Sequence, residues 1–163
     1  MKRKVFFSFH YKADHWRAAQ IRNAGFVEGN VPVSDNDWEE ITRGGEDAIK
    51  RWINEQMKGR SCVVVLIGSR TAGRKWINYE IKKGWVDGKG LLGIYIHNLK
   101  DQNGEQTSKG NNPFARFTLN ERPLSQIVKS YDPPFSDSRD VYEYIKENIA
   151  DWVEEAIEIR SKY

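Results

Sequence analysis

The sequence predicts an α/β protein with a doubly wound, mostly parallel sheet of about five strands and helices on both of its faces. Residues 62–68 read CVVVLIG, a continuous apolar run that is typical of a central strand buried on both sides. Residues 91–97 read LLGIYIH and form a second run of this kind. Helical patterns alternate with these strands along the chain, which is the order that produces a parallel sheet.

The first third of the chain predicts a strand, a helix and a turn-rich segment. Residues 4–11, KVFFSFHY, are rich in Val and aromatic residues and predict the first strand. A helix is expected from Asp14 to Asn23, with Asp14 as its N-cap. A short strand at most is expected near Val31–Val33, followed by polar turns around Asp35–Asp37.

The rest of the chain predicts three helices and a long polar insertion. Helices are expected over residues 46–59, 74–85 and 136–160, because apolar residues recur in each at helical spacing. Residues 98–126 show little periodicity, and a last short strand is expected at 127–131. With no repeat or linker, residues 1–163 are expected to form a single domain.

Composition limits the classes of partner and the cellular compartment. Charged residues make up 30% of the chain, yet the formal net charge is only +3 and both signs are mixed, so we expect neither a nucleic-acid nor a membrane partner. The single cysteine, Cys62, suits a reducing compartment. The basic start is followed by too few apolar residues for a signal peptide, and no run approaches a membrane span. A cytoplasmic location is expected.

Ligands of doubly wound sheets bind outside the carboxyl ends of the strands, which selects three loops here. These loops are His10–Ala13, Ser34–Trp38 and Ser69–Lys75. Ser69 and Arg70 precede a helix, which weakly suits a diphosphate, although a turn with solvated basic residues is the simpler interpretation from sequence alone.

Several familiar sites are not indicated by the sequence. The G-x-G-x-x-G pattern of residues 88–93 ends a helix and leads into a strand, whereas a dinucleotide fingerprint must follow a strand and open a helix. The three histidines, His10, His15 and His97, lie on separate elements without ligand spacing, so no metal is expected. A phosphoacceptor receiver domain needs clustered carboxylates after the first strand, where this chain has Ser8, Phe9 and His10.

Trp76 and Glu80 form a Trp-x-x-x-Glu pair beside the apolar stripe of Ile77 and Ile81. Four residues make about one helical turn, so Glu80 is expected next to Trp76 at the edge of the buried face. The spacing alone favours a packed Trp and a solvated or paired acid.

Four stretches together resemble a TIR-like domain, the Toll/interleukin-1 receptor type, and in particular the bacterial TIR-like proteins of the Thoeris anti-phage defence system. They read VFFSFHY at the start, VVVLIGSRT in the middle, WINYEI in the next helix and IYIHNLKDQNGEQTSKGNNPF after the fourth strand. The resemblance implies a flavodoxin-like three-layer sandwich. It also implies that Glu80 is the catalytic glutamate of NAD cleavage and that the product is a cyclic ADP-ribose isomer, a second messenger for a separate effector protein.

NAD is then the expected substrate, with no metal required, and the chemistry needs one carboxylate. Nicotinamide in NAD leaves as a neutral base without a general acid, and Glu80 would hold the nicotinamide-side ribose while positive charge grows on it. The other candidate substrate-binding residues come from the cleft loops and from the Trp motif: Ser8, Phe9, His10, Tyr11, Trp38, Ser69, Arg70 and Trp76.

Alternative functions remain open at this point. The chain could be a plain NAD hydrolase, because cyclisation requires that water be excluded. It could also be a non-enzymatic TIR-type interaction module that assembles through Asp35–Trp38 and its helix faces, and a homo-oligomer is possible in either case. The insertion could serve as a lid, or it could bind a partner or have no function of its own, and the sequence favours neither interpretation.

Overall fold

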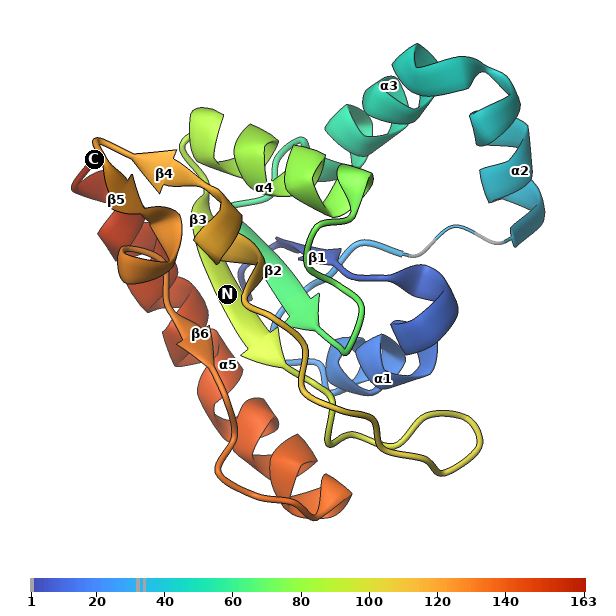
Figure 1. Ribbon diagram of the computed structural model, residues 1–163, viewed down its shortest axis with the longest axis vertical. Helices are drawn as coiled ribbons and strands as arrows, with labels where there is room; N and C mark the ends of the chain where they lie inside the picture. Colours follow the sequence, from blue (N-terminus) through green and yellow to red (C-terminus); the bar gives the residue numbers. More distant parts are fainter. Residues whose placement is uncertain (1, 32, 34) are drawn as a thin grey trace.

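The computed structural model describes residues 2–31, 33 and 35–163 and shows a parallel sheet between two layers of helices (Figure 1). The sheet has four strands in the order β1-β2-β3-β6, and all three pairings are parallel. In this order the strands are β1 (Val5–Ser8), β2 (Cys62–Ile67), β3 (Gly90–Tyr95) and β6 (Ser130–Tyr131). The doubly wound α/β fold class is confirmed.

The described residues form five α-helices, four of which flank the sheet. In chain order they are α1 (Tyr11–Asn23), α2 (Asp35–Arg43), α3 (Gly45–Met57), α4 (Lys75–Val86) and α5 (Ser138–Ser161). Buried residues of α1 and α5 form one core with the sheet, and those of α3 and α4 form a second core on the opposite face. Helix α2 packs on α3 and extends away from the sheet (Figure 1).

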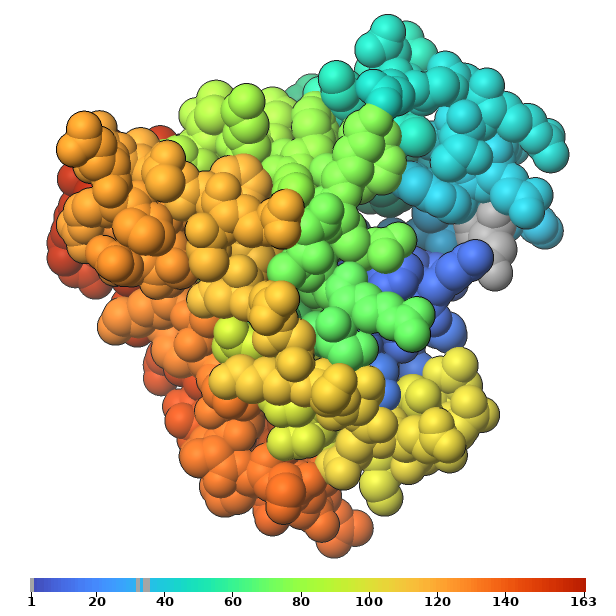
Figure 2. Space-filling view, in the orientation of Figure 1, coloured from blue at the N-terminus to red at the C-terminus, as the bar shows by residue number. Residues whose placement is uncertain are grey.

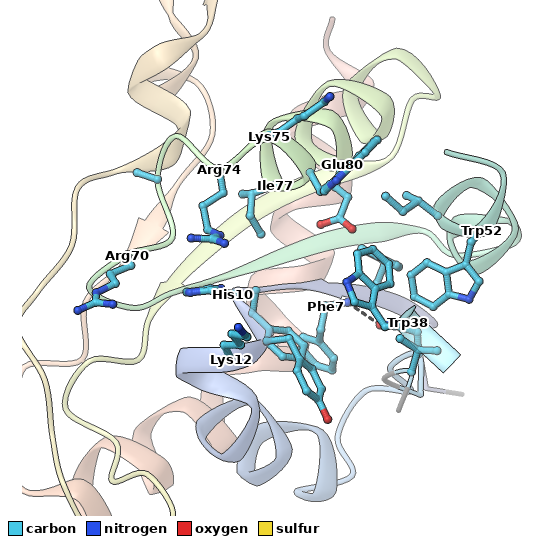
Figure 3. Close-up of a pocket in the computed structure, with 18 of the residues that line it drawn as sticks. Phe7, His10, Lys12, Trp38, Trp52, Arg70, Arg74, Lys75, Ile77 and Glu80 are labelled. Atoms are coloured by element: carbon cyan, nitrogen blue, oxygen red, sulfur yellow. Dashed lines mark hydrogen bonds between the residues drawn. The ribbon is translucent and has the colours of Figure 1, made fainter. Parts of the chain in front are cut away.

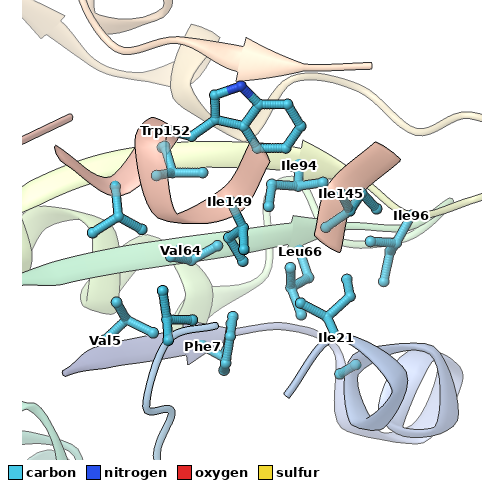
Figure 4. Close-up of a cluster of buried hydrophobic side chains, with 14 of the residues drawn as sticks. Val5, Phe7, Ile21, Val64, Leu66, Ile94, Ile96, Ile145, Ile149 and Trp152 are labelled. Carbon is cyan, nitrogen blue, oxygen red and sulfur yellow. The ribbon is translucent and has the colours of Figure 1, made fainter. Parts of the chain in front are cut away.

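Side-chain alternation along β2 supplies both cores at once. Val64 and Leu66 point into the α1/α5 core, where Figure 4 shows Leu66 near Ile145 of α5 and Val64 near Ile149. Val63 and Val65 point into the α3/α4 core. All six side chains of β2 are fully buried, which explains why the strand consists of a continuous apolar run rather than an alternating one.

The sheet has four strands rather than about five among the described residues, because no strand forms near Val31–Val33. Val31 and Val33 belong to no strand, and Pro32 lies outside the described residues. At this edge of the sheet, separate hydrogen bonds from amides of β1 take the place of a paired strand. The Val5 amide donates to the Glu28 carbonyl at 2.8 Å, and the Phe7 amide donates to Asn30 Oδ1 at 2.8 Å. A Cβ at Gly29 would lie 2.4 Å from the Phe7 ring, so the chain passes β1 too closely for a regular side chain.

Two further expectations in this part of the chain are wrong. Helix α1 begins at Tyr11 after His10, so Asp14 lies inside its first turn rather than at the N-cap. Asp14 is buried, and its Oδ1 accepts a hydrogen bond at 2.9 Å from the guanidinium of Arg17, three residues along the same helix. The predicted turn at Asp35–Asp37 is the start of α2, whose Trp38 and Ile41 pack against the α3/α4 core. Ser34 lies outside the described residues.

The insertion at 98–126 is packed into the body of the protein. Leu99 and Phe114 are fully buried in the two cores, and Gly110 passes so close to β2 that a Cβ there would lie 2.1 Å from the Gly68 carbonyl oxygen. It contains a two-stranded hairpin and two 3₁₀ turns: β4 (Thr118–Leu119), β5 (Arg122–Pro123), η1 (Pro113–Arg116) and η2 (Leu124–Gln126).

Arg17 of α1 anchors the beginning of this insertion. Its guanidinium donates to the carbonyl oxygens of Leu99 at 2.8 Å and Glu105 at 2.9 Å, and the residue is only 3% exposed. Figure 2 shows the insertion, from yellow to orange, lying across the front of the molecule beside the green segment that precedes α4. No helix in the described parts of the chain is both long and apolar enough to cross a bilayer.

Candidate active site

A cavity of about 800 Å³ opens at the carboxyl ends of β1 and β2, between the starts of α1 and α4 and the α2–α3 pair. This volume is typical of sites that hold a small molecule or cofactor. Its walls comprise Phe6, Phe7, Phe9, His10, Tyr11, Lys12, Asn30, Val33, Trp38, Trp52, Ile53, Arg70, Ala72, Gly73, Arg74, Lys75, Trp76, Ile77 and Glu80. The location follows the rule for doubly wound sheets.

Glu80 is the one acidic residue among the described residues that line this cavity. It lies in the second turn of α4 and is only 8% exposed. Ser8, the last residue of β1, donates a hydrogen bond from Oγ to Glu80 Oε1 at 2.6 Å. The apolar stripe of α4 turns Glu80 toward the sheet, because Ile77 and Ile81 on either side of it are buried in the core.

Burial determines the protonation of this carboxyl group. Loss of hydration raises the pKa of Glu80 to about 8, and the hydrogen bond from Ser8 acts in the opposite direction by favouring the carboxylate. Glu80 therefore holds a proton readily near neutral pH. A cation placed beside it would favour the ionised form.

Indole rings form the wall on one side of Glu80. Trp38 of α2 and Trp52 of α3 meet edge to face, with ring centroids 5.8 Å apart. Figure 3 shows both rings on the same side of the Glu80 carboxylate. Trp76 also lines the cavity and packs edge to face on Tyr79 at 5.7 Å. Flat aromatic faces of this kind can stack on a planar heterocycle.

Basic side chains form the wall on the other side. Figure 3 shows Arg70, Arg74, His10 and Lys12 opposite the two indole rings. Desolvation lowers the pKa of His10, and the charges of Arg74, Arg70 and Lys12 lower it further, which shows that all three cations act on this ring. His10 is therefore neutral near pH 7.

Most residues predicted from the sequence come together in the cavity. Phe9, His10, Tyr11, Trp38, Arg70, Trp76 and Glu80 line it. Ser8 reaches it through its hydrogen bond to Glu80, whereas Ser69 lies in the turn after β2 and is not among the lining residues. Their roles toward a ligand stay predictions.

Several lining residues were not among the candidates from the sequence, and those with polar or aromatic side chains include Trp52, Asn30, Lys12 and Arg74. Trp52 falls on the apolar stripe of the helix expected over residues 46–59, and it does pack against the core, but it also lines the cavity. Lys12 and Arg74 fall inside the loops that the strand-end rule selects, so that rule could have identified them. Asn30 directly precedes the strand expected near Val31–Val33, and no sequence signal indicated it.

The described residues contain no group of three or more His, Cys, Asp or Glu side chains that could hold a metal ion. The cavity instead combines one carboxyl group with aromatic and cationic side chains. Such a set can bind an anionic ligand that carries a planar ring and a polar group for Glu80.

Comparison with known proteins is consistent with this geometry. Residues 6–101 match the family model described as "Thoeris protein ThsB, TIR-like domain". The chain is also similar to a protein of Bacillus cereus (strain MSX-D12) named "Putative cyclic ADP-D-ribose synthase ThsB1", with 38% identity over 119 residues. This alignment covers 70% of the present chain and 62% of the relative, so the chain spans less than two thirds of that protein's length.

The matched region contains all of β1 except Val5, the cavity loops and all of α4, and therefore Ser8, Glu80 and the Trp76 motif. The resemblance noted from the sequence is thereby confirmed. This chain belongs to the TIR-like family of the Thoeris protein ThsB.

Proposed function

We propose that this protein cleaves NAD at the bond between nicotinamide and ribose and forms a cyclic ADP-ribose isomer. The product would be a second messenger that activates a separate effector protein in anti-phage defence. The family membership and the name of the B. cereus relative support this function. The observation that carries it is the buried Glu80 carboxyl group, held by Ser8 at 2.6 Å in a cavity large enough for a nucleotide.

Glu80 can supply what the cleavage step needs. When the bond between the ribose anomeric carbon and the nicotinamide nitrogen breaks, its electron pair goes to that nitrogen and neutralises the pyridinium ring. Positive charge then develops on the ribose, and a carboxylate nearby stabilises it in a site from which water is largely excluded. Glu80 would also accept hydrogen bonds from the ribose hydroxyls and so fix the sugar.

The substrate itself would prepare the carboxylate. Nicotinamide in NAD is cationic, and a cation close to a buried acid lowers the pKa of that acid. The raised pKa of Glu80, about 8, would therefore fall when NAD binds. The proton would be released to solvent before the glycosidic bond breaks.

The fate of the ribose distinguishes a cyclase from a plain hydrolase. A nucleophile within the ADP-ribose portion closes a ring at the anomeric carbon and loses a proton, whereas water at the same carbon gives ADP-ribose. On the side of Glu80 that faces Trp38 and Trp52, the indole rings favour ring closure, because they offer few polar groups to hold a water molecule.

The test is release of nicotinamide from NAD by the purified protein, followed by chromatography, with the product identified by mass spectrometry. We expect a product with the mass of cyclic ADP-ribose, and a loss of about 10²- to 10³-fold in rate for Glu80→Gln, since one electrostatic stabiliser of the transition state is removed. Glu143→Gln on the exposed face of α5 is the matched control and should match the wild type.

Lysates of phage-infected cells that express the chain provide the second arm, because a trigger or an assembled form can be required for activity. Release of nicotinamide at equal rates by wild type and Glu80→Gln would remove Glu80 from the mechanism. Assembly of the protein with no nicotinamide release in triggered lysates would instead favour a non-enzymatic interaction module. A product with the mass of ADP-ribose would indicate hydrolysis.

A further inference from the structure

The charged residues that line the cavity are unevenly placed. Of the described lining residues, four are Lys or Arg and one is an acid, Glu80. Lys75 is paired with Glu46 outside the cavity. The described residues offer no ion-pair partner to the other three cations, Lys12, Arg70 and Arg74. Their positive charge is thus available to a ligand.

These three cations gather at one end. Lys12 comes from the first turn of α1, and Arg70 and Arg74 come from the loop between β2 and α4. Figure 3 shows Arg70 and Arg74 on the side of Glu80 that faces away from Trp38 and Trp52. The cavity therefore has an indole end and a cationic end, with the Glu80 carboxyl group between them.

Two helix starts add to the cationic end. His10 and Arg74 are the N-cap residues of α1 and α4, both line the cavity, and neither side chain accepts a capping hydrogen bond. In contrast, α5 is capped by Asp137, whose side chain accepts from the amides of Arg139 and Asp140. The first amides of a helix are unpaired donors at the positive end of its dipole, so an anion can take the place of a cap.

We infer that the cationic end is a diphosphate-binding site, formed by Arg74, Arg70 and Lys12. Its ligand class is nucleoside diphosphates and dinucleotides. Arginine suits this class because its planar group donates two parallel hydrogen bonds to phosphate oxygens. This assignment follows from the positions of the three cations and the two helix starts, and it does not depend on the proposed function.

The direction of NAD in the cavity follows, and this step rests on the proposed function. With the diphosphate at Arg74, the adjoining nicotinamide ribose reaches Glu80, and nicotinamide lies beyond it against Trp38 and Trp52. The reverse orientation would place the diphosphate next to the Glu80 carboxyl group and the indole rings, where anions are poorly stabilised.

His10 offers a reporter of the bound anion. Its neighbours Arg74, Arg70 and Lys12 disfavour a charged imidazole, and desolvation acts in the same sense. A diphosphate between these cations would compensate their charge and raise the pKa of His10. A ligand without phosphate would not compensate the charge of these cations and would therefore not raise the pKa of His10 in this way.

The test compares ADP with adenosine as probes, by calorimetry and by NMR titration of the His10 ring. We expect ADP to bind at least tenfold more tightly than adenosine and to raise the pKa of His10. Arg74→Gln and Lys12→Gln should each weaken ADP binding by about tenfold, which is typical for loss of a charged hydrogen bond. Arg139→Gln, an exposed arginine at the start of α5, is the matched control. Equal affinities for ADP and adenosine, or unchanged ADP binding by Arg74→Gln, would overturn the inference.

A second measurement separates this inference from the proposed function. In the nicotinamide assay, Arg74→Gln should raise KM for NAD about tenfold and leave KM for nicotinamide riboside, which has no phosphate, unchanged. If ADP binds as expected but no nicotinamide is released, the diphosphate site holds and the NAD-cleaving function fails. If nicotinamide is released but Arg74→Gln changes neither KM nor ADP affinity, the function holds and the diphosphate site fails.

Discussion

The two ends of the cavity are held in place by different kinds of structure. The carboxyl end, with Glu80 and Ser8, is fixed by a buried helix stripe and by the last residue of β1. The cationic end lies on a loop and two helix starts, and its arginines are exposed. A buried acid changes its chemistry through its pKa, whereas an exposed cation acts through its charge. We therefore expect pH to act mainly at the first end and salt mainly at the second.

The largest expected effect is on stability at high pH. The pKa of Glu80 is about 8 in the folded protein against an ordinary 4.5, so the folded state retains a proton that the unfolded state has lost. This contribution is complete below pH 4.5 and disappears as the pH rises through about 8. Glu80→Gln, which keeps the shape and cannot ionise, should exceed the wild type in free energy of unfolding by about 5 kcal/mol at pH 9.

Urea denaturation at pH 4.5 and pH 9 measures this difference, and the two proteins should have nearly equal stability at the lower pH. Glu143→Gln serves again as the control, because Glu143 is exposed. If the free energy of unfolding of Glu80→Gln relative to wild type is the same at both pH values, Glu80 ionises normally. In that case pH would not act mainly at the carboxyl end of the cavity.

The next largest effect is on ligand binding, where NAD and ADP should respond differently to a change at the indole end of the cavity. Trp38→Ala removes one indole from the nicotinamide end, where loss of aromatic stacking costs about 1 kcal/mol or somewhat more. We expect KM for NAD to rise about tenfold and the affinity for ADP to stay the same. Arg74→Gln, in contrast, is expected to weaken ADP binding as well. Parallel losses in NAD and ADP binding would mean that Trp38 supports the whole cavity rather than one end.

A smaller effect is expected from Ser8→Ala in the pH profile of kcat/KM, which reports groups of the free enzyme. The wild-type profile should rise with pH toward a plateau above about 8, as Glu80 ionises. Ser8 favours the carboxylate, so its removal should shift this limb to higher pH. Identical limbs for Ser8→Ala and wild type would exclude Glu80 as the group that titrates.

The smallest expected effect is that of salt. Raising ionic strength from 50 to 200 mM should weaken ADP binding a few-fold, since Arg70 and Arg74 are exposed and are screened over about 10 Å. The rate of nicotinamide release at saturating NAD should remain the same, because Glu80 is buried. Calorimetry in two salt concentrations, beside the same release assay, measures both quantities.

The sequence predicted the parts of the fold whose burial is uniform. The apolar run of β2 fits only a central strand, because every residue of such a strand is buried. The stripe of α4 fits only a helix covered on one side, because every third or fourth residue is apolar. The strand-end rule then located the cavity. The Trp76–Glu80 spacing alone favoured a packed Trp and a solvated or paired acid, and only the resemblance to TIR-like domains singled out Glu80. That residues 1–163 form a single domain stays a prediction.

The parts that could not be predicted depend on single tertiary contacts. Asn30 replaces a strand partner for the Phe7 amide, a role that no pattern of hydrophobicity indicates. Asp14 is a residue type that often caps helices, yet α1 begins earlier, at Tyr11. The Asp14 carboxylate is instead buried against Arg17 of the same helix, which is itself held by the Leu99 carbonyl oxygen. Trp52 serves the core and the cavity together, and a stripe in the sequence records only the first role.

The contacts of Arg17 have a consequence for mutational tolerance. Its hydrogen bonds to the insertion end on carbonyl oxygens of Leu99 and Glu105, atoms that every residue possesses. The exposed residues Gln102 and Asn103 can therefore be exchanged without loosening the loop, whereas Arg17 cannot. Exposed positions of this loop such as these can vary in sequence while the backbone that Arg17 holds, and the cavity beside it, keep their form.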